Sequence, residues 1–293
     1  MCAPAIPAAG QAGQNPDIGS VIPLGKFDGV LLASDFDDTL YSSDFTVSPD
    51  NCRAIEYFIR EGGHFTVATG RAYKTFRAHA PMVPLNAPVI LSNGSCLYDF
   101  STDRVVYETF LPDRVRQDLA EVAEAFPSLG FEAYNGQDVY LHNPNQITWN
   151  HLRKTKATDG VMERPIGQMP LPWSKALLEQ DRPLLEQVRA YMQARWDEHY
   201  ELIFSNAVLL ELTEKGSNKG GMVLRLARDL GIDQGHIYCV GDNENDLPML
   251  AVSAIPFAPS NCAAVVKAWG PRLVGSCDES CVAEIIGILD TIY

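Results

Sequence analysis

Two aspartates separated by one residue, Asp35 and Asp37, follow an apolar run at 30–34. Such a run is typical of a buried parallel strand whose end opens into a loop. Residues i and i+2 of an extended segment share a face, so both carboxylates can converge on one reacting group. One would act as an ionised nucleophile while the other transfers protons. A solvated acidic turn is the simpler explanation of this pair when it is considered alone.

A second acidic cluster, Gly-Asp-Asn-Glu-Asn-Asp at 241–246, follows another apolar run at 237–240. Magnesium takes oxygen ligands and is usually held by one or two carboxylates together with substrate phosphate. The position of Asp242 directly after a strand therefore favours a role as a metal ligand. Asp246 precedes Leu247 and Pro248, and capping the first turn of a helix is an equally good role for it.

Lys219 stands at the start of a helix predicted over 219–230. The helix macrodipole disfavours a cation at that end, so we expect an anionic group nearby. The glycines at 216, 220 and 221 allow close approach of the backbone. Lys215, nearer the end of the preceding strand, is the competing candidate, and a solvated surface lysine is the alternative for either position.

Thr69, Gly70 and Arg71 end the next predicted strand, at 64–68. The hydroxyl and the backbone N–H groups of this segment could bind a phosphoryl oxygen. Taken alone the signal is weak, because threonine is common in strands. In open α/β sheets, however, ligands gather at the carboxyl ends of the strands. All four segments are therefore expected to meet at one edge of a sheet.

The order of predicted elements indicates an α/β core that is interrupted by an insertion. Strands and helices alternate from 30–34 through a helix at 49–60 to a strand at 88–92, and alternate again from an apolar run at 208–212 to a final helix at 280–291. Between them lie a hairpin (95–98 and 105–108), a helix (113–126), two strands (131–134 and 138–142), a loop rich in Pro and Met (162–173) and a helix (183–197). We therefore predict a flexible tail at 1–20, a discontinuous core at 21–94 and 206–293, and an inserted domain at 95–205.

Composition agrees with two medium-sized domains, since 293 residues with 46% hydrophobic and 20% charged residues are ordinary for a soluble globular protein. A formal net charge of -14 argues against nucleic acid or an anionic membrane as a partner. Seven scattered cysteines, without paired CxxC spacing, argue against a disulfide framework and a zinc site. No run reaches the roughly 18 apolar residues that cross a bilayer. We expect a cytoplasmic protein, a monomer or a weak homodimer.

The joint order of DxD, TGR, a glycine-flanked lysine and GDxxxD resembles the haloacid dehalogenase superfamily of phosphatases. The match is most specific to the Cof-type sugar-phosphate phosphatases, which show ATGR, SNG, SKG and GDNxND where this chain has 68–71, 92–94, 218–220 and 241–246. The resemblance implies a Rossmann-like parallel-sheet α/β core with an inserted α/β cap of the C2 type. Two positions depart from the pattern: Asp38 replaces the glycine of the common DxDGT motif, and Asn218 replaces the serine before the lysine.

The resemblance also implies roles for the residues. Asp35 would attack phosphorus and form an aspartyl phosphate, while Asp37 would protonate the leaving oxygen and later activate water. Mg²⁺ would be held by the Asp35 carboxylate, the Asp37 backbone carbonyl and Asp242. Thr69 and Lys219 would bind the phosphoryl oxygens.

Supporting roles follow from the same motifs: Asp246 would orient Lys219 or a metal-bound water, with Asn245 beside it, and Gly70, Arg71 and Asn93 would line the substrate site. The expected substrate is a small phosphorylated metabolite, for example a sugar phosphate. Two alternatives stay open, a phosphotransferase that resembles the phosphomannomutases and a non-catalytic binding protein. For five residues of the insertion two roles stay open, facing the substrate or packing in the interior of the insertion: Tyr134, His142, Trp149, Asn150 and His151.

Overall fold

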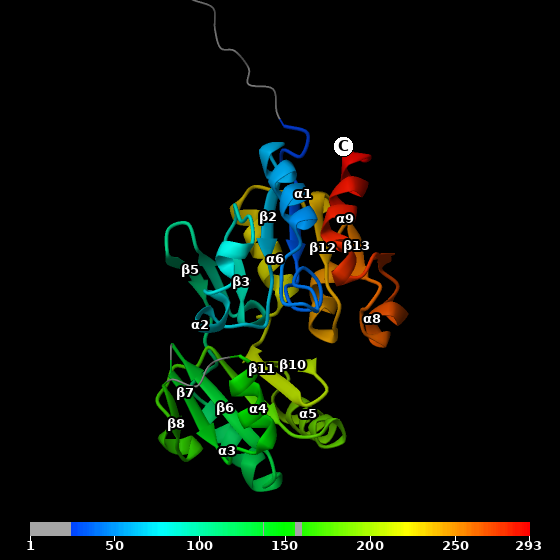
Figure 1. Ribbon diagram of the computed structural model, residues 1–293. Coiled ribbons are helices and arrows are strands. Elements are labelled where there is room, and N and C mark those ends of the chain that lie inside the picture. The colour runs from blue at the N-terminus through cyan, green and yellow to red at the C-terminus, as the bar shows by residue number, and fades with distance from the viewer. Residues whose placement is uncertain (1–24, 137, 156–159) are drawn as a thin grey trace, which may run out of the picture.

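The computed structural model describes residues 25–136, 138–155 and 160–293. The tail predicted at 1–20 lies outside these residues. Figure 1 shows two units, each built around its own sheet, with the first and last parts of the chain in the upper unit and the middle part in the lower one. The chain therefore leaves the upper unit, forms the lower unit and returns, as the predicted insertion requires.

The upper unit is built on a five-stranded sheet in the order β14-β13-β12-β1-β2. Every neighbouring pair in it is parallel, as predicted. Because β1 lies between β2 and β12, segments from both ends of the chain become neighbours. The strands are β1 (Leu31–Ser34), β2 (His64–Val67), β12 (Ile237–Val240), β13 (Ile255–Pro259) and β14 (Arg272–Val274).

Helices cover both faces of this sheet. Leu32 of β1 joins the apolar cluster formed with α1 and α9, whereas Leu31 and Ala33 join the cluster formed with α6, α7 and α8. A strand buried on both faces reads as an uninterrupted apolar run, which explains the pattern at 30–34. The helices are α1 (Pro49–Arg60), α2 (Tyr73–Phe76), α6 (Lys219–Asp229), α7 (Leu247–Ala251), α8 (Ala264–Trp269) and α9 (Cys281–Asp290).

Helix α1 begins where the sequence predicts. Its N-cap, Ser48, accepts a hydrogen bond from the Asn51 N–H at 3.1 Å, and Pro49 occupies the first helical position. A serine cap satisfies one of the N–H groups that a helix leaves unpaired at its start. Proline fits there because it has no N–H to satisfy.

A small antiparallel sheet of β3 (Val89–Leu91), β4 (Cys96–Asp99) and β5 (Arg104–Glu108) extends the upper unit. The predicted hairpin therefore exists, and it packs with the upper unit. Its buried residues Cys96, Leu97 and Tyr98 pack in the two apolar clusters of the upper unit. The change to antiparallel pairing was the sequence signal for a new domain. In the structure these strands form a separate sheet that adjoins the parallel sheet by a single bridge, between Ala68 and Ile90.

The lower unit is a six-stranded sheet in the order β10-β11-β9-β6-β7-β8. Its main apolar cluster includes Trp173 and residues of the two long helices, α3 (Val115–Ala125) and α5 (Arg182–Trp196), and the third helix is α4 (Gln146–Lys154). The strands are β6 (Gly130–Asn135), β7 (Asp138–His142), β8 (Val161–Glu163), β9 (Lys175–Glu179), β10 (Tyr200–Asn206) and β11 (Leu209–Glu214). The elements α4, β8, β9 and β10 were not predicted from the sequence.

The apolar run at 208–212 lies in this second sheet as part of β11, between β9 and β10, and not in the parallel sheet. A short apolar run identifies a buried strand but not the sheet to which it belongs. We therefore propose a core unit of residues 25–109 and 215–293 and a cap of residues 110–214, in place of boundaries at 94 and 206. The two crossings lie side by side, since Ser217 Oγ is 2.9 Å from Thr109 Oγ1.

No helix in the described ranges is long and apolar enough to span a membrane. The six cysteines within those ranges are all free thiols. The pair Cys277 and Cys281 is buried in the core unit, where thiols act as small apolar side chains.

Candidate active site

The predicted site residues follow three neighbouring strands of the parallel sheet. Ser34, the last residue of β1, pairs with Val240 of β12 and Val67 of β2, so all three strands end at the same level. Asp35 follows its strand directly, and Asp242 and Thr69 stand one residue further on, after Gly241 and Ala68. The structure therefore brings together the segments that the sequence placed at one sheet edge.

Lys219 lies between two carboxylates. Its Nζ donates to Asp35 Oδ1 at 2.5 Å and to Asp246 Oδ1 at 2.6 Å, and its side chain is completely buried. The anionic neighbour expected at the start of α6 is therefore a pair of aspartates. The competing candidate, Lys215, is 43% exposed and forms ion pairs with Asp197 and Glu201 of the cap.

The electrostatics of this group follow from burial. Burial opposes the charge of the Lys219 amine, but the carboxylates of Asp246 and Asp35 together raise its pKa above the ordinary value. Burial raises the pKa of Asp35 well above its usual range, Lys219 opposes that shift, and Asp246 and Asp242 add to it. The site is thus a cluster of carboxyl groups in which one buried ammonium is the main compensating charge.

Asp246 uses both of its carboxylate oxygens. Oδ1 accepts from Lys219, and Oδ2 accepts from the N–H groups of Asp242 and Asn243 at 2.9 and 3.0 Å. The alternative role as a cap holds in part: the Asp246 side chain makes no capping hydrogen bond to α7, but its bond to the Asn243 N–H closes a capping box on the short turn at 244–246. Asp246 also fixes the Asp242 loop and Lys219 relative to each other.

Asp37 is held by Arg71. The guanidinium donates to Asp37 Oδ2 from Nε at 2.8 Å and to Oδ1 from Nη2 at 2.6 Å, a two-point contact. Arg71 also lies over the ring of Phe36, 5.3 Å from its centroid. Arg71, predicted to line the substrate site, therefore faces the cavity and also positions the second aspartate.

The segment after β2 is braced from behind by Asn93. The Asn93 N–H donates to the Thr69 carbonyl at 3.0 Å, and Asn93 Oδ1 accepts from Asn245 Nδ2 at 3.0 Å. Thr69, Gly70 and Asn245 line the cavity, whereas Asn93 is completely buried behind them. Gly94 completes the turn at a φ of 104°, where an added Cβ would lie 2.3 Å from the Asn218 carbonyl oxygen.

Asp38 occupies the position at which the resembled motif commonly has glycine, and its φ of 59° lies in the left-handed region. Aspartate tolerates this region better than most side chains. Its carbonyl accepts from Asn261 Nδ2 at 2.8 Å, which holds the turn. The glycine of the motif thus has a conformational reason, and Asp38 meets the same requirement at some cost.

The carboxylates fit a hard divalent cation. Asp35, Asp242 and Asp246 each offer an oxygen within 4.8 Å of the others. Burial, followed by the charge of Asp246, raises the pKa of Asp242 to about 7, as expected for a carboxyl group that needs a further cation. Since both oxygens of Asp246 are already used, Asp35 and Asp242 are the better ligands.

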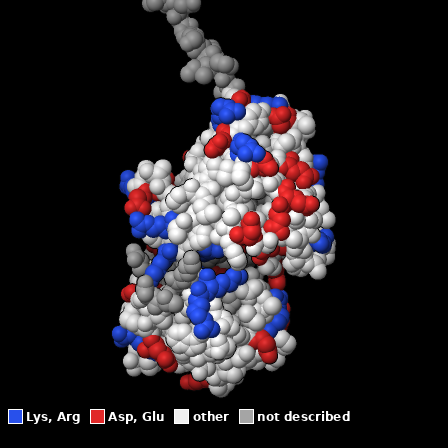
Figure 2. Space-filling view, in the orientation of Figure 1, with Lys and Arg blue, Asp and Glu red and all other residues white. Residues whose placement is uncertain are grey.

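A cavity of about 210 Å³ lies over these residues, between the core unit and the cap. Lys175 on β9 reaches across it, because its Nζ donates to the Gly70 carbonyl and to Glu211 Oε2, both at 3.1 Å. Figure 2 shows Lys and Arg side chains gathered where the two units meet. The lining residues from the cap are His151, Lys154, Thr155, Lys175, Ser205, Asn206, Leu209 and Glu211.

Sequence reasoning missed Lys175 and Glu211. The available signal was charged residues within two otherwise largely apolar strands, β9 and β11. Of the five cap residues considered from the sequence, His151 alone lines this cavity. Trp149 is 44% exposed, Tyr134 is buried, and His142 lines a separate hollow beside Pro127 and Arg164.

Comparison with known proteins agrees with this arrangement. Residues 32–286 match the family model of the haloacid dehalogenase-like hydrolases, so the chain belongs to that family. The predicted fold, a Rossmann-like core with an inserted cap, and the predicted enzyme class, the phosphoric monoester hydrolases, are thereby confirmed.

Among curated proteins, the chain is 26% identical over 266 residues to the 5-amino-6-(5-phospho-D-ribitylamino)uracil phosphatase YitU of Bacillus subtilis, covering 87% of this chain and 96% of that one. It is 22% identical over 265 residues to the pyridoxal phosphate phosphatase YbhA of Escherichia coli, with 87% and 97% covered. The solved structure of the subclass IIB sugar phosphatase BT4131 superposes with a TM-score of 0.75 at 17% identity, over 89% of this chain and 99% of that one.

Proposed function

We propose that this protein is a Mg²⁺-dependent phosphatase that hydrolyses a small phosphorylated metabolite through an aspartyl phosphate on Asp35. The observation that carries the proposal is the buried Lys219 between Asp35 and Asp246. Lys219 engages one oxygen of Asp35, at the edge of a cavity that Asp35 itself lines. The other oxygen is then the one that attacks phosphorus, and the ammonium is prepositioned for the charge that spreads over the phosphoryl oxygens.

The reaction would proceed in two steps. In the first, Asp35 forms a bond to phosphorus, the bond to the ester oxygen breaks, and Asp37 gives that oxygen a proton. In the second, Asp37 takes a proton from water, the water oxygen attacks the aspartyl phosphate, and inorganic phosphate leaves Asp35 as a carboxylate. Arg71 holds both oxygens of Asp37 in the ionised form, so one of these two contacts would open when Asp37 carries the proton.

Mg²⁺ would be held by the Asp35 carboxylate, the Asp37 backbone carbonyl and Asp242, and would neutralise charge on the phosphoryl group. Thr69 and Lys219 would contact the remaining phosphoryl oxygens. Asp246 keeps Lys219 and the Asp242 loop in place, and the contact of Asn245 with Asn93 braces the turn behind Thr69.

The cap would select the leaving group. Lys154, Lys175 and His151 present cationic or hydrogen-bonding groups to the cavity, which suits a polar metabolite such as a sugar phosphate. The two curated relatives named above act on a phosphorylated ribitylaminouracil and on pyridoxal phosphate. We extend to this chain only the shared class, a small phosphorylated metabolite, together with a cytoplasmic location and a monomeric or weakly dimeric state.

A phosphate-release assay over a panel of metabolites, with Mg²⁺ and after chelation, tests the proposal. Asp35→Asn should lower the rate by about 10⁴-fold or more, because the amide cannot act as the nucleophile. Asp113→Asn, an exposed substitution in the cap, serves as the matched control. Hydrolysis that survives in Asp35→Asn, or that ignores chelation, contradicts the mechanism.

The same assay separates the two alternatives. A phosphotransferase would move a phosphoryl group between a sugar bisphosphate and a second hydroxyl, and the assay would detect no free phosphate. A binding protein would retain substrates without turnover, although the complete set of Asp35, Asp37, Lys219 and Asp242 argues against it.

A further inference from the structure

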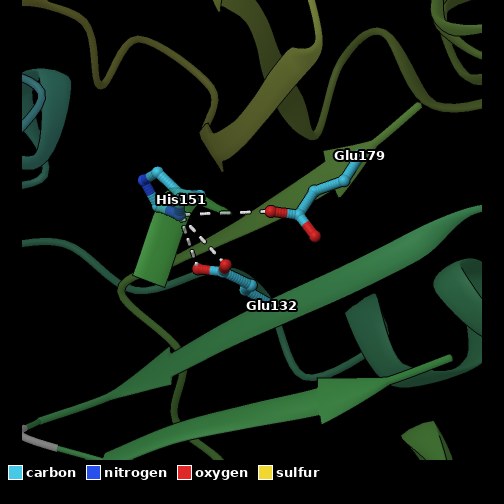
Figure 3. A group of neighbouring side chains, drawn as sticks. All are labelled: Glu132, His151 and Glu179. Carbon is cyan, nitrogen blue, oxygen red and sulfur yellow. Dashed lines mark hydrogen bonds and ion pairs between the residues drawn. The ribbon is translucent and has the colours of Figure 1, made fainter. Parts of the chain in front are cut away.

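The cap contains a second cluster of titratable side chains, outside the site described above. Figure 3 shows Glu132 of β6, His151 of α4 and Glu179 of β9 converging, although they come from three different elements. His151 Nδ1 lies 3.0 Å from Glu132 Oε1 and 4.0 Å from Glu179 Oε1. Both glutamates are completely buried, whereas His151 is partly exposed and borders the cavity.

Hydroxyl groups orient each carboxyl group from its far side. Tyr134 donates to Glu132 Oε2 at 2.5 Å, and Thr148 donates to Glu179 Oε2. Thr148 is itself held in place by the Asn145 N–H at 3.0 Å. One oxygen of each carboxyl group is therefore anchored. His151 Nδ1 lies close to both oxygens of Glu132, at 3.0 and 3.2 Å, and Glu179 Oε1 faces the same nitrogen.

Glu179 Oε1 has no hydrogen-bond partner although it is buried. A buried acceptor without a partner is costly, and it points to a cation or a proton at this place. Within the described ranges, neither glutamate forms an ion pair with Lys or Arg. In this respect the cluster lacks what Lys219 supplies in the core unit.

We propose that Glu132, His151 and Glu179 form a second metal site, for a divalent transition-metal ion of the Zn²⁺ type. Two carboxylate oxygens and one imidazole nitrogen are a donor set that such ions accept. Separations of 3.0 and 4.0 Å between the donor atoms suit bonds of about 2.0 to 2.2 Å to one shared ion. The Tyr134 and Thr148 hydroxyls are the outer contacts that orient the ligands of a metal site.

The ion would link α4 to the sheet of the cap. Helix α4 carries His151 and Lys154 at the wall of the active-site cavity, and Thr155 follows it directly. Occupancy of the site would therefore set the position of side chains that face the substrate, which makes the site structural for the cap and not part of phosphoryl transfer.

Titration of the full-length, chelator-treated protein with Zn²⁺ tests the proposal. The titration is done on Asp242→Asn, which removes a ligand of the core site, with millimolar Mg²⁺ present. Calorimetry should report one Zn²⁺ per chain, and Zn²⁺ should raise the melting temperature. Adding Glu179→Gln should weaken binding by about 100-fold or more, since a ligand is lost, whereas Glu163→Gln, an exposed cap substitution, should leave it unchanged.

Absence of Zn²⁺ binding to Asp242→Asn overturns the proposal, as does unchanged affinity in the Glu179→Gln variant. Either result means that the two carboxyl groups share a proton instead. Should Glu179→Gln fail to fold, His151→Gln replaces it in the titration, because the His151 side chain is partly exposed. An unchanged Zn²⁺ affinity in His151→Gln would also overturn the proposal. The readout is independent of phosphatase activity, so failure of the proposed reaction does not affect it.

Discussion

The two units of the molecule each bury a cluster of carboxyl groups, and they balance the charge in different ways. In the core unit, Lys219 contacts Asp35 and Asp246 directly. In the cap, His151 is the one side chain among the described residues that could pair with Glu132 and Glu179 as a cation. A buried charge must be paired or neutralised. The core cluster carries a permanent cation within the chain, whereas the cap cluster depends on a proton or an added ion.

The largest effect on this comparison should come from Lys219→Met. The substitution leaves Asp35 and Asp246 buried without their cation, so we expect the free energy of unfolding to fall by about 3–5 kcal/mol, measured by urea denaturation. Phosphatase activity should be lost as well. The matched change in the cap, Glu179→Gln, should cost less at pH 7, because it removes no paired charge. Equal losses of unfolding free energy in the two variants would show that both clusters depend on a paired charge to the same extent.

The pH dependence of stability should also differ between wild type and Glu179→Gln. Burial, and then the charge of Glu132, raises the pKa of Glu179 to about 9. The ordinary value, which applies to the unfolded chain, is about 4.3. The folded protein then holds a proton that the unfolded chain releases, so this contribution is present in full below the ordinary value and is lost as pH rises toward 9.

Urea titrations in chelator between pH 5 and 9 measure that slope. Wild type should lose stability over this range more steeply than Glu179→Gln, which carries no titratable group at that position. The raised pKa of Asp242 also makes stability fall as pH rises, at lower pH than Glu179 does, and this contribution is the same in both proteins. Parallel curves for the two proteins would contradict the raised pKa of Glu179.

A smaller effect is expected from Lys175→Met, which tests the buried Lys175–Glu211 pair beside the cavity. Lys175 donates to Glu211 and to the Gly70 carbonyl, and neither of these hydrogen bonds involves Asp35. We expect KM to rise by about 10-fold with kcat little changed, because binding and not transition-state stabilisation is lost. Steady-state kinetics on the best substrate measure this, and a fall confined to kcat would be the opposite result.

The smallest effect should come from Asp38→Gly. The left-handed φ of 59° strains a side chain by about 1–2 kcal/mol, and the freedom of glycine in the unfolded chain offsets about half of that. The substitution also removes a negative charge that raises the pKa of Asp242. Thermal and urea unfolding should show a net gain of about 0.5–1 kcal/mol, with Asp38→Ala, which keeps a Cβ, as the control without a gain.

The chemistry of the core site was determined largely by the sequence. Apolar runs before Asp35, Thr69 and Asp242 predict strand ends, and parallel strands end at a common edge, so local patterns sufficed to group these residues. Lys219 was identified because a cation at a helix start requires a partner. Identifying that partner as Asp35 together with Asp246 required the structure, since those contacts join residues far apart in the chain.

Which side chains of the cap become neighbours depends on tertiary structure. Strand β9 is buried at every position and shows no alternation, and β11 reads as a buried strand of either sheet. Helix α4 is amphipathic and begins at an Asn145 cap, a local signal that the sequence prediction missed. Lys175, Glu211 and the Glu132, His151 and Glu179 cluster become neighbours only when antiparallel strands align in register. A one-residue change of register would turn these side chains to the other face, and nothing local in the sequence specifies that register. The reacting groups can thus be predicted from strand ends, whereas the groups that meet the substrate depend on how distant strands pair.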